Sequence, residues 1–119
     1  MKKIEFLDLL IESKKIKEKY LKNLDFYFKE IKKFFQKKLG KKTKILIFGS
    51  FVKENFGPRS DIDVLVILPK EISWQKRRKL IFEIRKKIGF LSPFEFHLAS
   101  KKEFEDWWKN FIKKDYKEI

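Results

Sequence analysis

Residues 61–68, Asp-Ile-Asp-Val-Leu-Val-Ile-Leu, constrain the fold more than any other segment. The apolar run that begins at Ile62 is typical of a short buried strand. Because side chains alternate between the two faces of a strand, Asp61 and Asp63 share one face while Ile62 points into the core on the other. We therefore expect a sheet with one closed face and a second face on which two carboxylates meet.

The rest of the chain supplies the other layers of an α+β fold. Gly and Pro are absent from residues 4–39, where apolar residues recur at helical spacing, so we expect a long N-terminal helix, either continuous or broken near Ser13. The remaining elements are strands over 44–50, 61–68 and 94–100, a helix over 73–88 that is capped by Ser73, and a last helix from Ser100. This order predicts a small mixed sheet of three or more strands backed by helices.

Two patterns on the predicted helices have more than one interpretation. Trp107 and Trp108 are adjacent, so only one of them can face the core fully, and the other packs against a partner or stacks on a base. The basic run at 76–79 could bind a polyanion, but the other face of its helix is apolar, so we expect the run to lie on a solvated face. The buried face of that helix is expected to hold Trp74, Leu80, Ile81, Ile84 and Ile88.

Composition narrows the chemistry. The chain has 119 residues and no cysteine, which indicates one domain and excludes disulfides, thiolate metal sites and cysteine nucleophiles. Any metal must therefore bind through oxygen or through His97, the single histidine. Acidic residues interrupt the first apolar stretch and no run is long enough to span a membrane, so we expect a cytoplasmic protein without membrane contact.

The formal net charge of +14 has two interpretations. A basic surface gains affinity for RNA or another polyanion by releasing counterions. Abundant Lys and Glu with little Cys or Met are equally expected of a protein from a thermophile, whatever its function.

The N-terminal helix would overhang so small a domain. Its apolar part would then need a cover, which predicts either a homodimer or a partner protein.

The strand over 94–100 adds a third acid. Its alternation places Glu95 and His97 on one face, and Phe94 and Phe96 on the other. If this strand lies beside residues 61–68, Glu95 joins the aspartates in a cluster that suits Mg²⁺ or Mn²⁺. We interpret His97 as a polar neighbour of that cluster.

Gly49-Ser50, at the end of the first strand, completes the pattern. Glycine allows a phosphate to approach the backbone, and the serine amide and hydroxyl can donate hydrogen bonds to it. The segment GSFVKENFGPRSDIDVLVI, residues 49–67, resembles the signature of the DNA polymerase β-like nucleotidyltransferase superfamily, and most of all its minimal nucleotidyltransferases. Residues 93–108 resemble the third-carboxylate strand and following helix of these proteins.

The resemblance implies one nucleotidyltransferase domain over 1–119, with an N-terminal helical segment over 1–40 and a catalytic core over 44–112. It implies that Asp61, Asp63 and Glu95 are catalytic and hold Mg²⁺, and that the nucleotide is bound by Gly49, Ser50, Lys53, Arg59 and Ser60. Two positions depart from the family pattern: Glu54 replaces a common Gly, and Glu95 replaces a common Asp.

The implied reaction transfers a nucleoside monophosphate, AMP from ATP, to an acceptor hydroxyl. Minimal nucleotidyltransferases resemble the antitoxin of toxin–antitoxin pairs, whose partner is a HEPN-type ribonuclease, so the acceptor would be a tyrosine of that partner. The alternative is a non-catalytic subunit of the same fold that binds a partner protein or RNA. Transfer to a small molecule is disfavoured because no acceptor-binding domain is expected.

Overall fold

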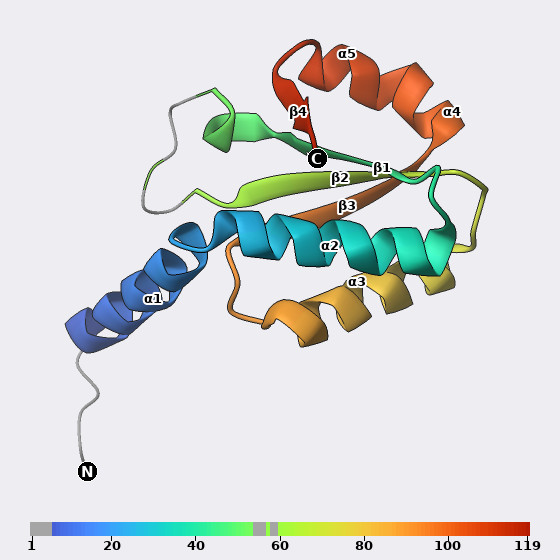
Figure 1. The fold of residues 1–119 in the computed structure, drawn as a ribbon. Helices are drawn as coiled ribbons and strands as arrows, with labels where there is room; N and C mark the ends of the chain where they lie inside the picture. Colours follow the sequence, from blue (N-terminus) through green and yellow to red (C-terminus); the bar gives the residue numbers. More distant parts are fainter. Residues whose placement is uncertain (1–5, 54–56, 58–59) are drawn as a thin grey trace.

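A computed structural model describes residues 6–53, 57 and 60–119 and confirms the α+β architecture (Figure 1). The described residues form a mixed sheet of four strands in the order β3-β2-β1-β4. In chain order the elements are α1 (Phe6–Leu21), α2 (Leu24–Leu39), β1 (Lys44–Phe48), the 3₁₀ turn η1 (Gly49–Phe51), β2 (Ile62–Leu68), α3 (Trp74–Ile88), β3 (Phe94–Ser100), α4 (Lys101–Glu103), the π-helical turn η2 (Phe104–Trp108), α5 (Lys109–Ile112) and β4 (Tyr116–Glu118).

Strand pairing follows from the connections. β1 and β2 are antiparallel, whereas β2 and β3 are parallel and are joined through α3. β4 pairs with β1 in the antiparallel direction and was not predicted, because Tyr116–Glu118 is too short to show a strand period. The sheet thus has β2 in its interior, with buried neighbours on both sides.

One face of the sheet packs against α2 and α3, which lie side by side across it (Figure 1). The alternate residues of β1, β2 and β3 on this face are aliphatic or Phe, and they meet Ile31, Phe35 and Ile84 from the two helices. All three helical residues are fully buried. This cluster is the main hydrophobic core.

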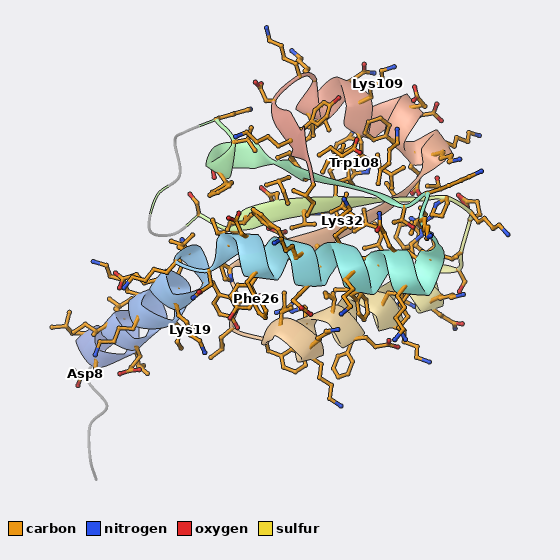
Figure 2. All side chains as sticks on the ribbon, in the orientation of Figure 1. Asp8, Lys19, Phe26, Lys32, Trp108 and Lys109 are labelled. Carbon is orange, nitrogen blue, oxygen red and sulfur yellow. The ribbon has the colours of Figure 1, made fainter. Side chains whose placement is uncertain are left out.

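The opposite face is covered over only part of its area. Leu65, Ile67 and Ala99 pack under the C-terminal helical segment formed by α4, η2 and α5, which contributes Phe104 and Ile112. Figure 2 shows side chains, including Trp108, filling the space between this segment and the sheet. The same strands begin in polar residues on this face, beyond the smaller core.

The N-terminal helical segment is broken, but not at Ser13 as expected. α1 is continuous through Ser13, and the break falls at Lys22 and Asn23, between α1 and α2. The Asn23 side chain donates a hydrogen bond of 2.8 Å to the carbonyl of Lys19. This bond gives a carbonyl in the last turn of α1 a partner where the helix ends and the chain turns. α1 consequently projects away from the body of the molecule (Figure 1).

The predicted N-cap of α3 is confirmed, but its buried face differs from the prediction. Ser73 accepts a hydrogen bond from the Lys76 amide, and Gly89 follows the last turn with φ of 113°. Trp74 is 61% exposed, whereas Arg77, from the run expected to be solvated, is 3% exposed. A long side chain can be buried when its charge is paired, and the interactions of Arg77 meet that condition.

Arg77 connects α3 to the opposite side of the sheet. Its Nη1 donates to Glu103 Oε1 at 2.8 Å and to the carbonyl of Leu98 at 3.3 Å. The ring of Trp74 lies 4.2 Å from the guanidinium carbon, which explains why this tryptophan stays at the surface. The two hydrogen bonds therefore join α3 to β3 and to α4.

Basic side chains are spread over the described surface. Lys19, Lys32 and Lys109 are exposed on α1, α2 and α5 respectively (Figure 2). None of the described helices is both long enough and apolar enough to cross a bilayer.

Candidate active site

One row of residues crosses the sheet at the beginning of β2 and β3. Tyr116 pairs with Phe48, Phe48 with Asp63, and Asp63 with Glu95. Paired residues point to the same side of a sheet, so the two carboxylates lie next to each other on the partly covered face. Sequence periodicity predicted this face for both acids, and the parallel pairing of β2 with β3 brings them together.

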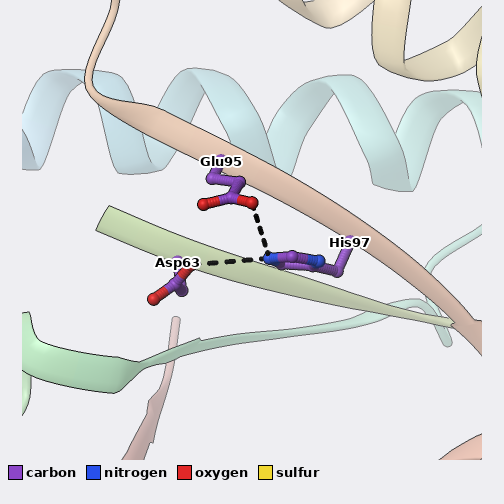
Figure 3. A group of neighbouring side chains, drawn as sticks. All are labelled: Asp63, Glu95 and His97. Atoms are coloured by element: carbon purple, nitrogen blue, oxygen red, sulfur yellow. Dashed lines mark hydrogen bonds and ion pairs between the residues drawn. The ribbon is translucent and has the colours of Figure 1, made fainter. Parts of the chain in front are cut away.

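Asp63, Glu95 and His97 form a compact group of ligand atoms (Figure 3). Each offers one nitrogen or oxygen atom, and the three atoms lie within 4.8 Å of one another. His97 Nε2 is 3.4 Å from Asp63 Oδ1 and 3.8 Å from Glu95 Oε1. The side chains are 24%, 53% and 27% exposed for Asp63, Glu95 and His97, so a ligand from solvent can reach all three.

Gly49, the first residue of η1 directly after β1, lies against this group. Its φ is +83°, a conformation that L side chains rarely adopt, and a Cβ at this position would lie 2.3 Å from Asp63 Oδ2. The backbone at Gly49 therefore leaves room for the Asp63 carboxylate. The glycine predicted to let a phosphate approach the backbone is therefore also needed to make room for the Asp63 side chain.

Asp61 lies outside the compact group. It is exposed, immediately before β2 begins at Ile62. Lys17 Nζ from α1 donates to the carbonyls of Ser60 and Gly57, at 2.5 Å and 3.2 Å. Burial lowers the pKa of Lys17, and the charge of Asp61 opposes that shift. α1 thus contacts the chain that leads into Asp61.

The predicted nucleotide-binding residues are distributed around the start of β2. Ser50 is half-buried in η1, and Lys53 is exposed just after that turn. Ser60 Oγ accepts a hydrogen bond of 3.1 Å from the Gly57 amide. Arg59 and Glu54 lie outside the described residues.

Aromatic rings hold His97 in place. The ring centroids of Trp108 and Phe48 lie 5.3 Å and 5.7 Å from that of the imidazole. Trp107, by contrast, is exposed and stacks on Phe111 at 5.0 Å. The strand period predicts His97 on the same face as Glu95, and the structure places its Nε2 within the group of ligand atoms and not merely beside it.

The sequence matches the family described as Nucleotidyltransferase domain over residues 28–119. A crystal structure of a candidate nucleotidyltransferase is 34% identical, with a TM-score of 0.64, and the match covers 77% of this chain and 96% of that one. A candidate nucleotidyltransferase from Sulfolobus solfataricus shares the fold at 20% identity and a TM-score of 0.55, covering 92% of this chain and 84% of its own. Comparison with curated proteins gives no significant match. The family match and the 34% identical structure show that the chain belongs to the nucleotidyltransferase domain family.

Proposed function

We propose that this nucleotidyltransferase transfers AMP from ATP to an acceptor hydroxyl and requires a divalent cation, Mg²⁺ or Mn²⁺, to do so. The observation that carries the proposal is the in-register pair of Asp63 and Glu95 beside Gly49. Two carboxylates in adjacent strand positions repel each other unless a cation or solvent lies between them. Their retention on an exposed face favours a working site.

The donor set fits a divalent cation. Asp63, Glu95 and His97 offer oxygen and nitrogen atoms within 4.8 Å of one another, and all three are accessible. Asp61, exposed at the entry to β2, is the candidate for a further ligand. A cation held there would neutralise negative charge on the reacting phosphate and on the leaving pyrophosphate.

The chain itself would bind and orient the nucleotide. The amides at Gly49 and Ser50 and the Ser50 hydroxyl would donate to phosphate oxygens, as expected at a turn after a strand. Lys53, Arg59 and Ser60 are the further candidates for phosphate contact. Such contacts fix the α-phosphate in line with the acceptor.

Glu95 is the proposed base. Its side chain is the most exposed of the three neighbouring ligand residues, so an incoming hydroxyl can reach it. Glu95 would accept the proton of that hydroxyl as it attacks the α-phosphorus. Asp63, which is less exposed, would remain a ligand throughout.

The proposed acceptor is a tyrosine hydroxyl on a HEPN-type partner protein. This assignment rests on family resemblance, and the exposed Leu7, Leu10 and Ile11 on α1 support a protein partner that would cover them. A second copy of the chain could cover the same residues.

Calorimetric titration of ATP tests the nucleotide site. Binding of ATP should be seen with Mg²⁺, be lost with EDTA, and be lost in an Asp61→Ala/Asp63→Ala variant. An Asp8→Ala/Asp25→Ala variant removes the same charge from exposed positions on α1 and α2 and should bind like the wild type. Equal, metal-independent binding by all three proteins would contradict the proposal and favour a non-catalytic subunit.

The reaction itself is tested with ATP labelled at the α-phosphate and, in parallel, at the γ-phosphate. Transfer of the α label alone to a co-purified partner identifies nucleotidyl transfer, because phosphoryl transfer would move the γ label. CTP, GTP and UTP labelled in the same way test the preference for adenine. Absence of α-label transfer to any protein or RNA present would argue against the proposed acceptor.

A further inference from the structure

We infer that His97 is a direct ligand of the divalent cation and that its imidazole shifts the preference of the site from Mg²⁺ toward Mn²⁺. This inference rests on the proposed metal-dependent function and adds a residue that the carboxylate pattern of the sequence does not assign. It also predicts how the affinities for Mg²⁺ and Mn²⁺ change when the imidazole is removed.

The three ligand atoms lie close enough for side-chain rotation to bring them onto neighbouring positions of one octahedral cation. Adjacent ligands with bonds of about 2.1 Å lie about 3.0 Å apart, and opposite ligands about 4.2 Å apart. His97 Nε2 lies 3.4 Å and 3.8 Å from the nearest oxygens of Asp63 and Glu95. The present separations, which extend up to 4.8 Å, are longer than those of adjacent ligands, so side-chain rotation of the two partly exposed carboxylates is needed to bring all three atoms onto one face of the coordination sphere.

The imidazole is aimed at the carboxylates by its surroundings. His97 lies in β3 opposite Leu65 of β2, so its backbone is fixed by the sheet. Trp108 and Phe48 contact the ring, and its Nε2 points toward Asp63 and Glu95 (Figure 3). A ring held in this way is pre-organised for binding and has little room to move aside.

Ligand chemistry then sets the preference. Mg²⁺ binds oxygen ligands and loses its waters reluctantly, so it gains little from imidazole. Mn²⁺ also prefers carboxylates, but as a first-row transition ion it binds an added imidazole more tightly than Mg²⁺ does. A site of two carboxylates and one imidazole should therefore bind Mn²⁺ more tightly than the carboxylates alone would. We expect His97→Asn to lower Mn²⁺ affinity by about tenfold or more and to change Mg²⁺ affinity much less.

Pulsed electron paramagnetic resonance of the Mn²⁺-loaded protein tests direct ligation. His97 is the only histidine of the chain, so nitrogen coupling typical of imidazole can arise from no other side chain in a protein without a histidine tag. Spectra would be recorded with Mn²⁺ alone and with Mn²⁺ plus a non-hydrolysable ATP analogue. The coupling should be present in the wild type and lost in His97→Asn, whereas a signal from adenine would persist in the variant.

Titration of Mn²⁺ and Mg²⁺ into both proteins provides the second measurement, with circular dichroism to establish that His97→Asn is folded. A fall in the ratio of Mn²⁺ to Mg²⁺ affinity supports the inference. Mn²⁺ binding that depends on Asp63 but shows no imidazole coupling in either sample overturns it and leaves the proposed function intact. Failure of the wild type to bind either cation, with or without nucleotide, overturns both.

Discussion

The two faces of the sheet differ in how completely they are covered. On the face beneath α2 and α3, the strand residues Ile62, Val64 and Val66 are fully buried in one continuous core. On the opposite face, the C-terminal helical segment covers Leu65 and Ile67, and the row with Asp63 and Glu95 stays accessible. β1, β2 and β3 therefore form a packing surface on one face of the sheet and carry the candidate site on part of the other face.

The difference shows where a small domain can place charge. A carboxylate on the closed face would lose its solvation without a partner, at a cost of several kcal/mol. At the start of β2 and β3 on the open face, a carboxylate keeps its access to solvent and to ligands. The closed face, beneath α2 and α3, should therefore control stability. The open row, formed by Asp63 and Glu95 on the other face, should control activity.

The largest effect is expected from a cavity in the closed face. Phe35 is 0% exposed, and Phe35→Ala should lower the free energy of unfolding by about 3–5 kcal/mol. Phe26→Ala, on the same helix but 57% exposed, should change it by less than about 1 kcal/mol. Urea unfolding followed by circular dichroism measures both, and similar losses in the two variants would contradict the described packing of α2.

The next largest effect should come from Arg77, which joins the two sides of the sheet. Arg77→Met removes charge-assisted bonds to Glu103 and the Leu98 carbonyl and should cost about 2–3 kcal/mol. The exposed neighbour Arg78 is the matched control, and Arg78→Met should cost less than about 0.5 kcal/mol. A stable Arg77→Met protein would mean that apolar packing of the stem, and not the ion pair, matters there.

A smaller effect, specific to the open row, is expected at Gly49. Both Gly49 and Gly40 have positive φ, but only Gly49 would place a Cβ against Asp63, since nothing lies within 4 Å of a Cβ at Gly40. Each Ala variant should lose about 1 kcal/mol from backbone strain, and Gly49→Ala should also weaken ATP binding with Mg²⁺. Equal ATP affinity in the two variants would show that the Asp63 carboxylate is free to move.

A still smaller effect concerns acid stability. Burial alone would raise the pKa of Glu103, but hydrogen bonds from Ser100 and from Arg77 outweigh it, so the pKa is lowered from its ordinary value of 4.5. Ionised Glu103 thus stabilises the fold above pH 4.5, and this contribution is lost as the pH falls through the lowered pKa.

Glu103→Gln removes that contribution. The variant should be less stable than the wild type at neutral pH, and the difference should shrink below pH 4.5. Thermal unfolding across this range measures the trend, with Glu105→Gln, exposed on the same helical segment, as the control. A difference that does not vary with pH would assign the effect to lost packing.

The smallest effect on stability is expected at Asp63 itself. Without divalent cations, Asp63→Asn should change the free energy of unfolding by less than about 0.5 kcal/mol, because it relieves repulsion from Glu95 while losing only a long contact to His97. Nucleotidyl transfer, in contrast, should fall by about 100-fold or more. A destabilisation comparable to that of Phe35→Ala would erase the distinction between the two faces.

Local patterns predicted much of the fold. The period of two in residues 61–68 and 94–100 placed Asp63 and Glu95 on one face, and Ser73 and Ser100 marked the starts of their helices. These features depend on neighbouring residues in the chain, which is why sequence analysis can detect them.

Features set by contacts between distant segments were predicted less well. Arg77 looked like a surface residue because its partners Leu98 and Glu103 lie more than twenty positions away. The break at Asn23 interrupts a run whose apolar period is unbroken, and β4 gains its strand conformation from β1 alone. Similarly, only the pairing of β2 with β3 reveals that His97 is nearer than Asp61 to the Asp63–Glu95 pair.

The row formed by Phe48, Asp63 and Glu95 also bears on how the sheet chooses its alignment. A slip of one residue in β2 against its neighbours, with the strand turned over to match, would send Asp63 into the core under α2 and α3. Burying that charge unpaired costs several kcal/mol, comparable to the whole stability of a small domain. Asp63 and Glu95, which are proposed to hold the nucleotide's cation, thus also disfavour the misaligned sheet. A variant in which both residues are neutral should lose this discrimination between alignments.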